Sequence, residues 1–149
     1  MTLQTGMMLL AAKMPLDMMI SKMSEGMVET LKIFFLTLLF SLPLGLVIAF
    51  GRMAKNRIIR YIVTVYIAIM RGTPLMLQVM AIYFGPNYLL HIRIPRSYRF
   101  IAIIVAFALN YAAYFAEIYR SGIESMPVGQ YEAARLLGYN KAQTFFKII

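Results

Sequence analysis

Three long apolar runs, separated by short segments that hold most of the charges, dominate this chain. The first run is uncharged from Ile33 to Phe50. As a helix with a rise of about 1.5 Å per residue it extends roughly 27 Å, close to the thickness of a bilayer's hydrocarbon core. The pattern therefore predicts a first membrane span at about 31–50, with a kink near Pro43, which lipid-embedded helices tolerate.

The second run, from Tyr61 to Leu90, is interrupted by the segment Arg71-Gly72-Thr73-Pro74. Two placements are open: a span at about 61–84 with Arg71 near mid-membrane, or a span that begins around Thr73 after an interfacial segment. Proline has no backbone N–H and crowds the preceding turn, so we expect a bend at Pro74 that frees carbonyl groups. The segment Gly85-Pro86-Asn87 predicts the end of this helix.

The third run, uncharged from Phe100 to Ala116, predicts a span at about 100–118. Its helix is expected to continue, because Glu117, Arg120 and Glu124 stand at the i,i+3 and i,i+4 spacings that favour ion pairs. Pro127 should end it.

Two shorter helices are expected after this point. A helix at about 130–138 has Gly138 where a left-handed C-terminal cap favours glycine. Asn140 and Gln143 have the spacing of a capping box that opens another helix, at 141–149, which we interpret as the start of a fourth span. The predicted fold class is thus an all-α, polytopic membrane protein with three full spans, over residues 29–149, preceded by an amphipathic lead-in at 1–28.

Composition and charge support a membrane protein. The chain is 61% hydrophobic and 14% charged, against about 45–50% and 25% in soluble domains, which argues strongly against a soluble globular enzyme. The formal charge of +9 comes from bases that flank the apolar runs, which indicates topology signals and contacts with anionic lipid and not nucleic-acid binding. The basic loop that contains Arg52, Lys55, Arg57 and Arg60 favours a cytoplasmic position, which puts the N-terminus outside, although the bases between the second and third runs oppose this orientation.

No catalytic or cofactor site is expected. The chain has no cysteine and a single histidine, His91, so neither a thiolate nucleophile nor a Cys/His metal site is predicted. Phosphate-cradling glycine loops and nucleophile elbows are also missing from the sequence. We therefore expect no cofactor and no enzyme activity in this chain.

Polar residues inside the apolar runs are the candidate functional groups. Arg71 at mid-depth costs at least about 2.5–3.5 kcal/mol, so it should face protein, water or a partner unless it reaches the headgroups. Asn110, Tyr114 and Glu117 share one helix face, which is consistent either with a translocation path or with packing between helices. Asn110 or Tyr114 is the expected partner of Arg71.

Three motifs resemble one family. The segment Gly129-Gln130-Tyr131-Glu132-Ala133-Ala134-Arg135-Leu136-Leu137-Gly138 resembles the EAA loop of ABC importer permeases. Two further elements are similar to those of the polar amino-acid (histidine/glutamine-type) branch of this family. One is the Arg71-to-Pro74 segment with Gln78, and the other is the set Ala113, Tyr114, Glu117 and Arg120.

The resemblance implies a permease subunit of an ATP-driven importer for polar amino acids in the cell membrane of a prokaryote. Its expected partners are ABC ATPase subunits, which would hydrolyse the ATP, a second permease chain, an external substrate-binding protein and membrane lipid. It implies that the 130–138 helix couples to the ATPase through Gly129, Gln130, Tyr131, Glu132, Ala133, Ala134, Leu137 and Gly138. The residues assigned to the translocation path or to assembly are Arg71, Thr73, Pro74, Gln78, Asn110, Tyr114 and Glu117.

Family members have about five spans, so the resemblance predicts a chain truncated at its C-terminus. The alternative function is that of a non-transporting membrane scaffold, such as a truncated permease.

Overall fold

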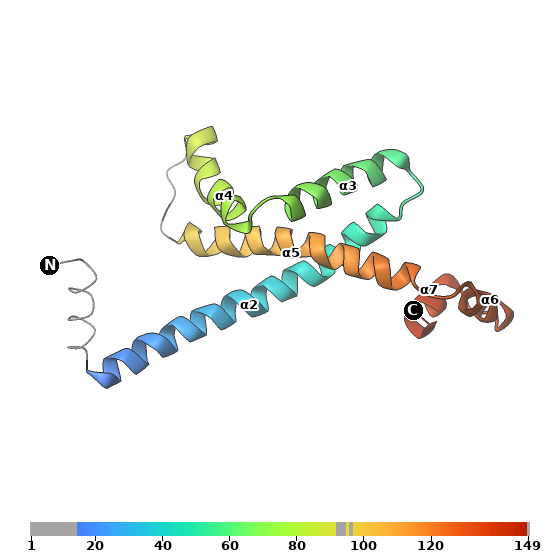
Figure 1. Cartoon of the computed structure of the whole chain (residues 1–149), viewed down its shortest axis with the longest axis horizontal. Helices are drawn as coiled ribbons and strands as arrows, with labels where there is room; N and C mark the ends of the chain where they lie inside the picture. Colours follow the sequence, from blue (N-terminus) through green and yellow to red (C-terminus); the bar gives the residue numbers. More distant parts are fainter. Residues whose placement is uncertain (1–14, 92–94, 96, 149) are drawn as a thin grey trace. The chain divides into compact units, whose positions relative to one another are not determined.

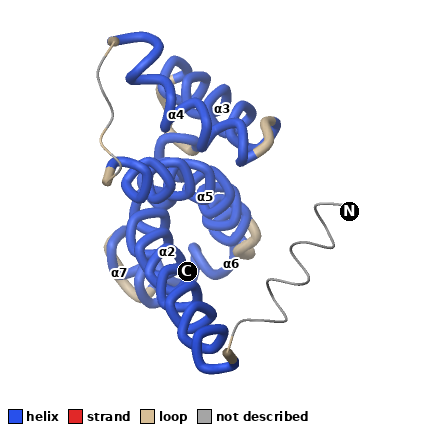
Figure 2. The backbone as a smooth tube through the Cα atoms, turned by 90° about the vertical axis from the view of Figure 1, so that its left-hand side faces the viewer, coloured by secondary structure: helices blue, strands red, loops and turns tan. Residues whose placement is uncertain are grey.

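The computed structural model describes residues 15–91, 95 and 97–148. All regular structure in these residues is helical, with no strand (Figure 2), which confirms the all-α class. The helices are α2 (Leu16–Arg52), α3 (Arg57–Gly72), α4 (Leu75–Leu90), α5 (Tyr98–Glu124), α6 (Val128–Leu136) and α7 (Lys141–Ile148).

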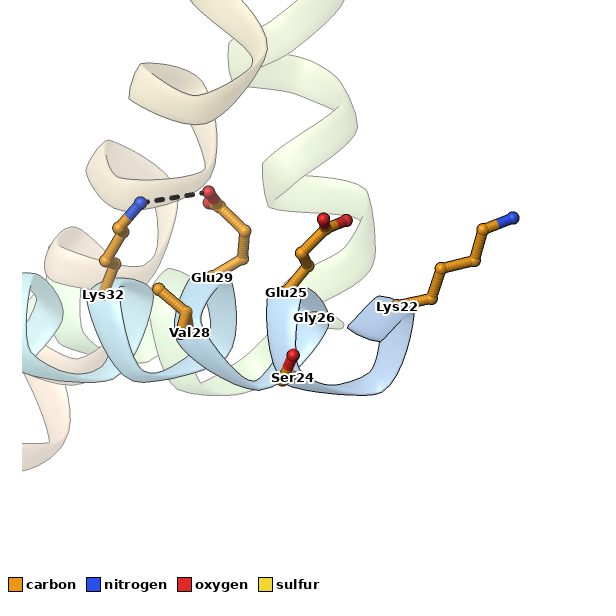
Figure 3. Close-up of a pocket in the computed structure, with 7 residues that line it drawn as sticks. All are labelled: Lys22, Ser24, Glu25, Gly26, Val28, Glu29 and Lys32. Atoms are coloured by element: carbon orange, nitrogen blue, oxygen red, sulfur yellow. Dashed lines mark hydrogen bonds and ion pairs between the residues drawn. The ribbon is translucent and has the colours of Figure 1, made fainter. Parts of the chain in front are cut away.

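Contacts divide the chain into two units, Met1–Leu36 and Thr37–Ile149. In the first unit α2 begins at Leu16, and residues 1–14, half of the expected lead-in, lie outside the described residues. Four charged side chains, Lys22, Glu25, Glu29 and Lys32, project from this one helix, and Lys32 Nζ lies 3.2 Å from Glu29 Oε1 (Figure 3). They form an exposed charged stripe that lines an open surface cavity of about 680 Å³.

In the second unit, α2 buries one narrow ridge of small side chains. The buried residues are Thr37, Ser41, Gly45 and Ala49, each four positions after the last. Residues four apart lie one above the other on a helix, and small side chains let helix backbones approach closely in lipid. The helix continues through Pro43 to Arg52.

The ridge of α2 packs against α5, which is lined with alanine. A Cβ added to Gly45 would lie 2.7 Å from the Cβ of Phe115 and 3.2 Å from the carbonyl oxygen of Ala112. Next to this crossing, Ala49 packs with Ala113, Ala116 and Ile67 in the core of the unit. Close approach of backbones, more than bulk apolar volume, therefore holds α2 to α5.

The second apolar run forms two helices and not one. The helices α3 and α4 meet at a bend of 107° beside α5 (Figure 1). Each has 16 residues, or about 24 Å of helix, less than the roughly 30 Å of a hydrocarbon core. By length and composition, α2 and α5 could each cross a membrane, and the bent pair would supply a third span only if its two arms count together.

The predicted stop at Gly85-Pro86-Asn87 is wrong. The helix α4 continues through Pro86 to Leu90. Because Pro86 has no N–H, the Ile82 carbonyl loses its usual helical donor, but the Tyr98 hydroxyl from α5 donates to that carbonyl at 3.3 Å. A tertiary donor thus replaces the missing bond and the helix persists.

The two short helices predicted after the third apolar run are present, as α6 and α7. Gly138 has φ 73°, its N–H donates to the Arg135 carbonyl, and the N–H of Tyr139 donates to the Ala134 carbonyl at 2.9 Å, which together form a Schellman cap. Asn140 and Gln143 exchange backbone-to-side-chain hydrogen bonds of 3.0 and 2.8 Å, which is the expected capping box.

Candidate translocation and coupling sites

The bend between α3 and α4 is stabilised by amide side chains from two helices. Because Pro74 cannot donate, the Met70 carbonyl lacks its helical partner. Asn110 Nδ2 donates to this carbonyl at 2.8 Å, and Gln78 Nε2 donates to it at 2.9 Å. Asn110 Nδ2 also donates to Gln78 Oε1 at 3.0 Å. The bend is therefore a satisfied polar structure, held to α5 by one buried asparagine.

Thr73 connects the two arms of the bend. Its backbone is extended, with φ −113° and ψ 144°, as expected for a residue before proline. Its hydroxyl donates to the Ile69 carbonyl at 2.8 Å and accepts from Gln78 Nε2 at 2.7 Å. Thr73 and Gln78 thus cap the ends of the arms, which explains why this segment needs their side chains.

Arg71 lies over an aromatic ring. Its guanidinium carbon is 5.3 Å from the centroid of the Tyr114 ring. Of the two expected partners, Tyr114 is the one that Arg71 contacts, and Asn110 instead binds the neighbouring carbonyl of Met70. A cation over a ring contributes roughly 0.5–1 kcal/mol when exposed and about 2 or more when desolvated.

Glu117 forms the centre of an ion cluster that joins three helices. Its Oε2 accepts from Arg120 Nη2 at 2.7 Å, and its Oε1 lies 3.4 Å from Arg52 Nε. Arg120 also pairs with Glu124 at 2.5 Å, as the spacing predicts. Arg52, from the end of α2, reaches the Thr64 hydroxyl on α3 as well.

The sequence indicated Arg52 only as a topology signal and did not predict its contact with Glu117. The signal was present in the predicted topology, because Arg52 follows the end of the first apolar run and Glu117 follows the end of the third, on the same predicted side of the membrane. Helices whose ends lie on one side can bring opposite charges together there.

The structure therefore brings the seven expected path residues into two adjoining groups. Thr73, Pro74, Gln78 and Asn110 form the bend. Arg71, Tyr114 and Glu117 line one cleft of about 430 Å³ together with Ile118, Arg120 and Ser121. Of the seven, Asn110 is the most buried, with 5% of its surface exposed.

The expected coupling segment forms α6 and its glycine cap. Tyr131 points back to the preceding helix, where its hydroxyl donates to the Ile123 carbonyl at 3.1 Å. Ala134 is fully buried against the chain itself, while Ala133 is exposed. The two alanines therefore have opposite environments, and only Ala133 is available to a partner.

The rest of α6 is open. Leu136 and Leu137 are 90% and 69% exposed, although both are apolar. The exposed members of the expected coupling set are Gly129, Gln130, Glu132, Ala133, Leu137 and Gly138.

Within residues 15–91, 95 and 97–148, no group of three or more His, Cys, Asp or Glu side chains is arranged to hold a metal ion. The charged groups described above bind one another and an aromatic ring. These contacts join the helices α2 and α5 and tie Arg71 of α3 to Tyr114 of α5.

Comparison with known proteins defines the family. Residues 41–149 match the family described as binding-protein-dependent transport system inner membrane component. The chain belongs to this family, and it is a multi-pass inner-membrane protein with an amino-acid ABC permease architecture.

Several relatives are similar over most of this chain. It is 42% identical over 114 residues to the arginine transport system permease protein ArtQ of Bacillus subtilis (strain 168), covering 76% of this chain and 51% of that protein. It is 38% identical over 117 residues to GlnP of Rickettsia prowazekii (strain Madrid E), named for glutamine transport, covering 78% and 52%. The chain spans about half the length of these curated relatives.

A solved structure shares the fold. The crystal structure of an amino acid ABC transporter with histidines matches with a TM-score of 0.72 at 36% identity, covering 89% of this chain and 61% of that chain.

Proposed function

We propose that this chain is a transmembrane permease subunit of an ATP-driven importer for polar amino acids. The observation that carries the proposal is α6, a nine-residue helix closed by the positive φ of Gly138 and followed directly by α7. It presents Gln130, Glu132 and Ala133 outward while Tyr131 and Ala134 face the chain.

This geometry suits transmission of force between two proteins. On the inner face of α6 the Tyr131 hydroxyl donates to the Ile123 carbonyl of α5, and this bond would couple a displacement of α6 to the end of α5. The outer face offers an acid for charge-assisted hydrogen bonds and a small residue for close approach. We assign this outer face to an ATPase subunit on the cytoplasmic side, with the N-terminus of the chain outside.

The relatives support the proposed cargo. ArtQ and GlnP are named for arginine and glutamine, and the solved transporter holds histidines. We assign an amino acid as cargo and alternating access as the mechanism, in which closure of two ATPases rocks two permease chains about a central path. An external binding protein would deliver the amino acid, and the polar residues of the bend and the cleft would line part of the path.

Reversal of the charge on the outer face of α6 tests the proposal. Tagged Glu132→Lys is expected to insert normally but to copurify with at least about tenfold less ATPase, since like charges at an interface cost several kcal/mol, and to lose amino-acid uptake. Glu25→Lys, which reverses an exposed glutamate of α2, is the matched control and should retain both. Unchanged ATPase recovery with Glu132→Lys would refute the coupling role, and a wild-type chain that recovers no ATPase would favour a scaffold.

A further inference from the structure

The cleft beside the α3–α4 bend has an unusual balance of charge. Its charged lining residues are Arg71, Glu117 and Arg120. Glu117 is already engaged by Arg120 and by Arg52, and Arg120 is engaged by both Glu117 and Glu124. Within the part of the chain that the structure describes, Arg71 forms no ion pair, and its guanidinium lies over the Tyr114 ring. One positive charge at the cleft is left uncompensated.

The contact with Tyr114 prepares Arg71 to bind an anion. A guanidinium is planar and carries five N–H donors around its edge. The Tyr114 ring lies below the Arg71 guanidinium, and a cation–π contact leaves N–H donors available to a further partner. A fixed fork of donors matches the two oxygens of a carboxylate.

Arg71 lies in the last turn of α3, beside the bend, and among the residues that the structure describes its positive charge has no counterion there. An uncompensated arginine within a span costs several kcal/mol unless it meets water, an anion or another polar group. The cleft of about 430 Å³ provides space for a small polar molecule beside Arg71. The adjacent bend cannot supply the missing charge, because Asn110, Gln78 and Thr73 are neutral.

We propose that Arg71, held by Tyr114, binds the α-carboxylate of the transported amino acid in this cleft. The inference rests on the proposed function, and it deepens it by naming the part of the cargo that is recognised. Amino acids with different side chains share the carboxylate, so a single arginine can serve all of them. The negative charge of Glu117 is already balanced by Arg52 and Arg120, so the proposal assigns it no role in binding the ammonium group.

The test measures binding of labelled L-histidine, L-arginine and L-glutamine to the permease–ATPase complex in nanodiscs without a substrate-binding protein, so that any selectivity belongs to the membrane part. Each amino acid is compared with its α-carboxamide, which keeps the ammonium group and the side chain but loses the negative charge. The wild type is expected to prefer the acid about tenfold to a hundredfold, as for hydrogen bonds to charged groups.

The variants separate recognition from folding. Arg71→Gln should bind the carboxamide as the wild type does and bind both forms equally. Arg71→Lys should keep part of the preference, Tyr114→Phe should keep it all, and Tyr114→Leu should weaken it. Arg57→Gln, an exposed arginine of the same helix, is the control and should behave as the wild type does.

Three results would overturn the inference. The first is an Arg71→Gln variant that still prefers the acid, and the second is a wild type that binds no amino acid or binds acid and carboxamide equally. The third is loss of the preference when anionic phosphatidylglycerol is added to phosphatidylcholine nanodiscs, because the anion at Arg71 would then be a lipid headgroup. The proposed function fails separately, if no ATPase copurifies with the wild-type chain.

Discussion

The crossing of α2 and α5 at Gly45 leads to a quantitative prediction for Gly45→Ala. The added Cβ would lie 2.7 Å from Phe115 Cβ and 3.2 Å from the Ala112 carbonyl oxygen. Both are fixed to the α5 backbone and cannot rotate away, so the helices must separate by roughly 0.7 Å to reach the 3.4 Å of an ordinary contact. Overpacking of this kind costs about 1–3 kcal/mol.

A second effect acts in the opposite direction and can be measured by itself. Alanine is a better helix former than glycine by about 0.8–1 kcal/mol. Gly26 lies in the same helix, and a Cβ there would meet nothing within 4 Å. Gly26→Ala therefore reports the propensity gain without the steric cost.

The assay is reversible unfolding of the purified chain in mixed micelles, with helicity followed by circular dichroism as the denaturing detergent is increased. The free energy of unfolding of Gly45→Ala should lie about 1–3 kcal/mol below that of Gly26→Ala. Equal stability of the two variants would refute the close approach at Gly45. A stability loss in Gly26→Ala would show that the control measures something other than propensity.

Three further predictions concern the polar sites and the α6 cap. Asn110→Leu should lower the free energy of unfolding by about 1–3 kcal/mol, because it removes two hydrogen bonds, to the Met70 carbonyl and to Gln78 Oε1; no change in denaturant titration would contradict the role of this side chain in the bend. Gly138→Ala should cost about 1–2 kcal/mol through its positive φ, whereas Gly129→Ala, at an open position inside α6, should be neutral or stabilising, and equal effects would disprove the cap. In a double-mutant cycle, Arg52→Gln and Glu117→Gln should show a coupling of at least about 0.5 kcal/mol that falls with added salt, and additivity would mean that the ion pair does not form.

Local features of the chain were predictable because their causes are local. The start of α7 follows from Asn140 and Gln143, which need only each other to form a capping box. The left-handed cap at Gly138 follows from the absence of a side chain there. The helical extent of the third apolar run likewise follows from its length without proline or glycine.

Prolines marked where hydrogen bonds would be lost, but they did not reveal how each loss would be compensated. Pro74 and Pro86 both deprive a carbonyl of its donor. At Pro74 the chain bends by 107°, and at Pro86 the helix continues. The donors differ. Asn110 and Gln78 donate to the Met70 carbonyl at the bend, whereas the Tyr98 hydroxyl donates to the Ile82 carbonyl in the continuous helix. Apart from Gln78, these donors come from α5, and no local rule identifies them.

The sequence by itself determined that the chain is helical, apolar enough for a membrane, and related by motif to importer permeases. Hydrophobic runs and short motifs act over a few residues, so reading along the chain is sufficient for them. Only the tertiary structure decided that Arg52 pairs with Glu117 and that Arg71 lies on Tyr114. Pairing of charges 65 positions apart depends on how helices cross, and that crossing is set by the small-residue ridge of α2 against α5.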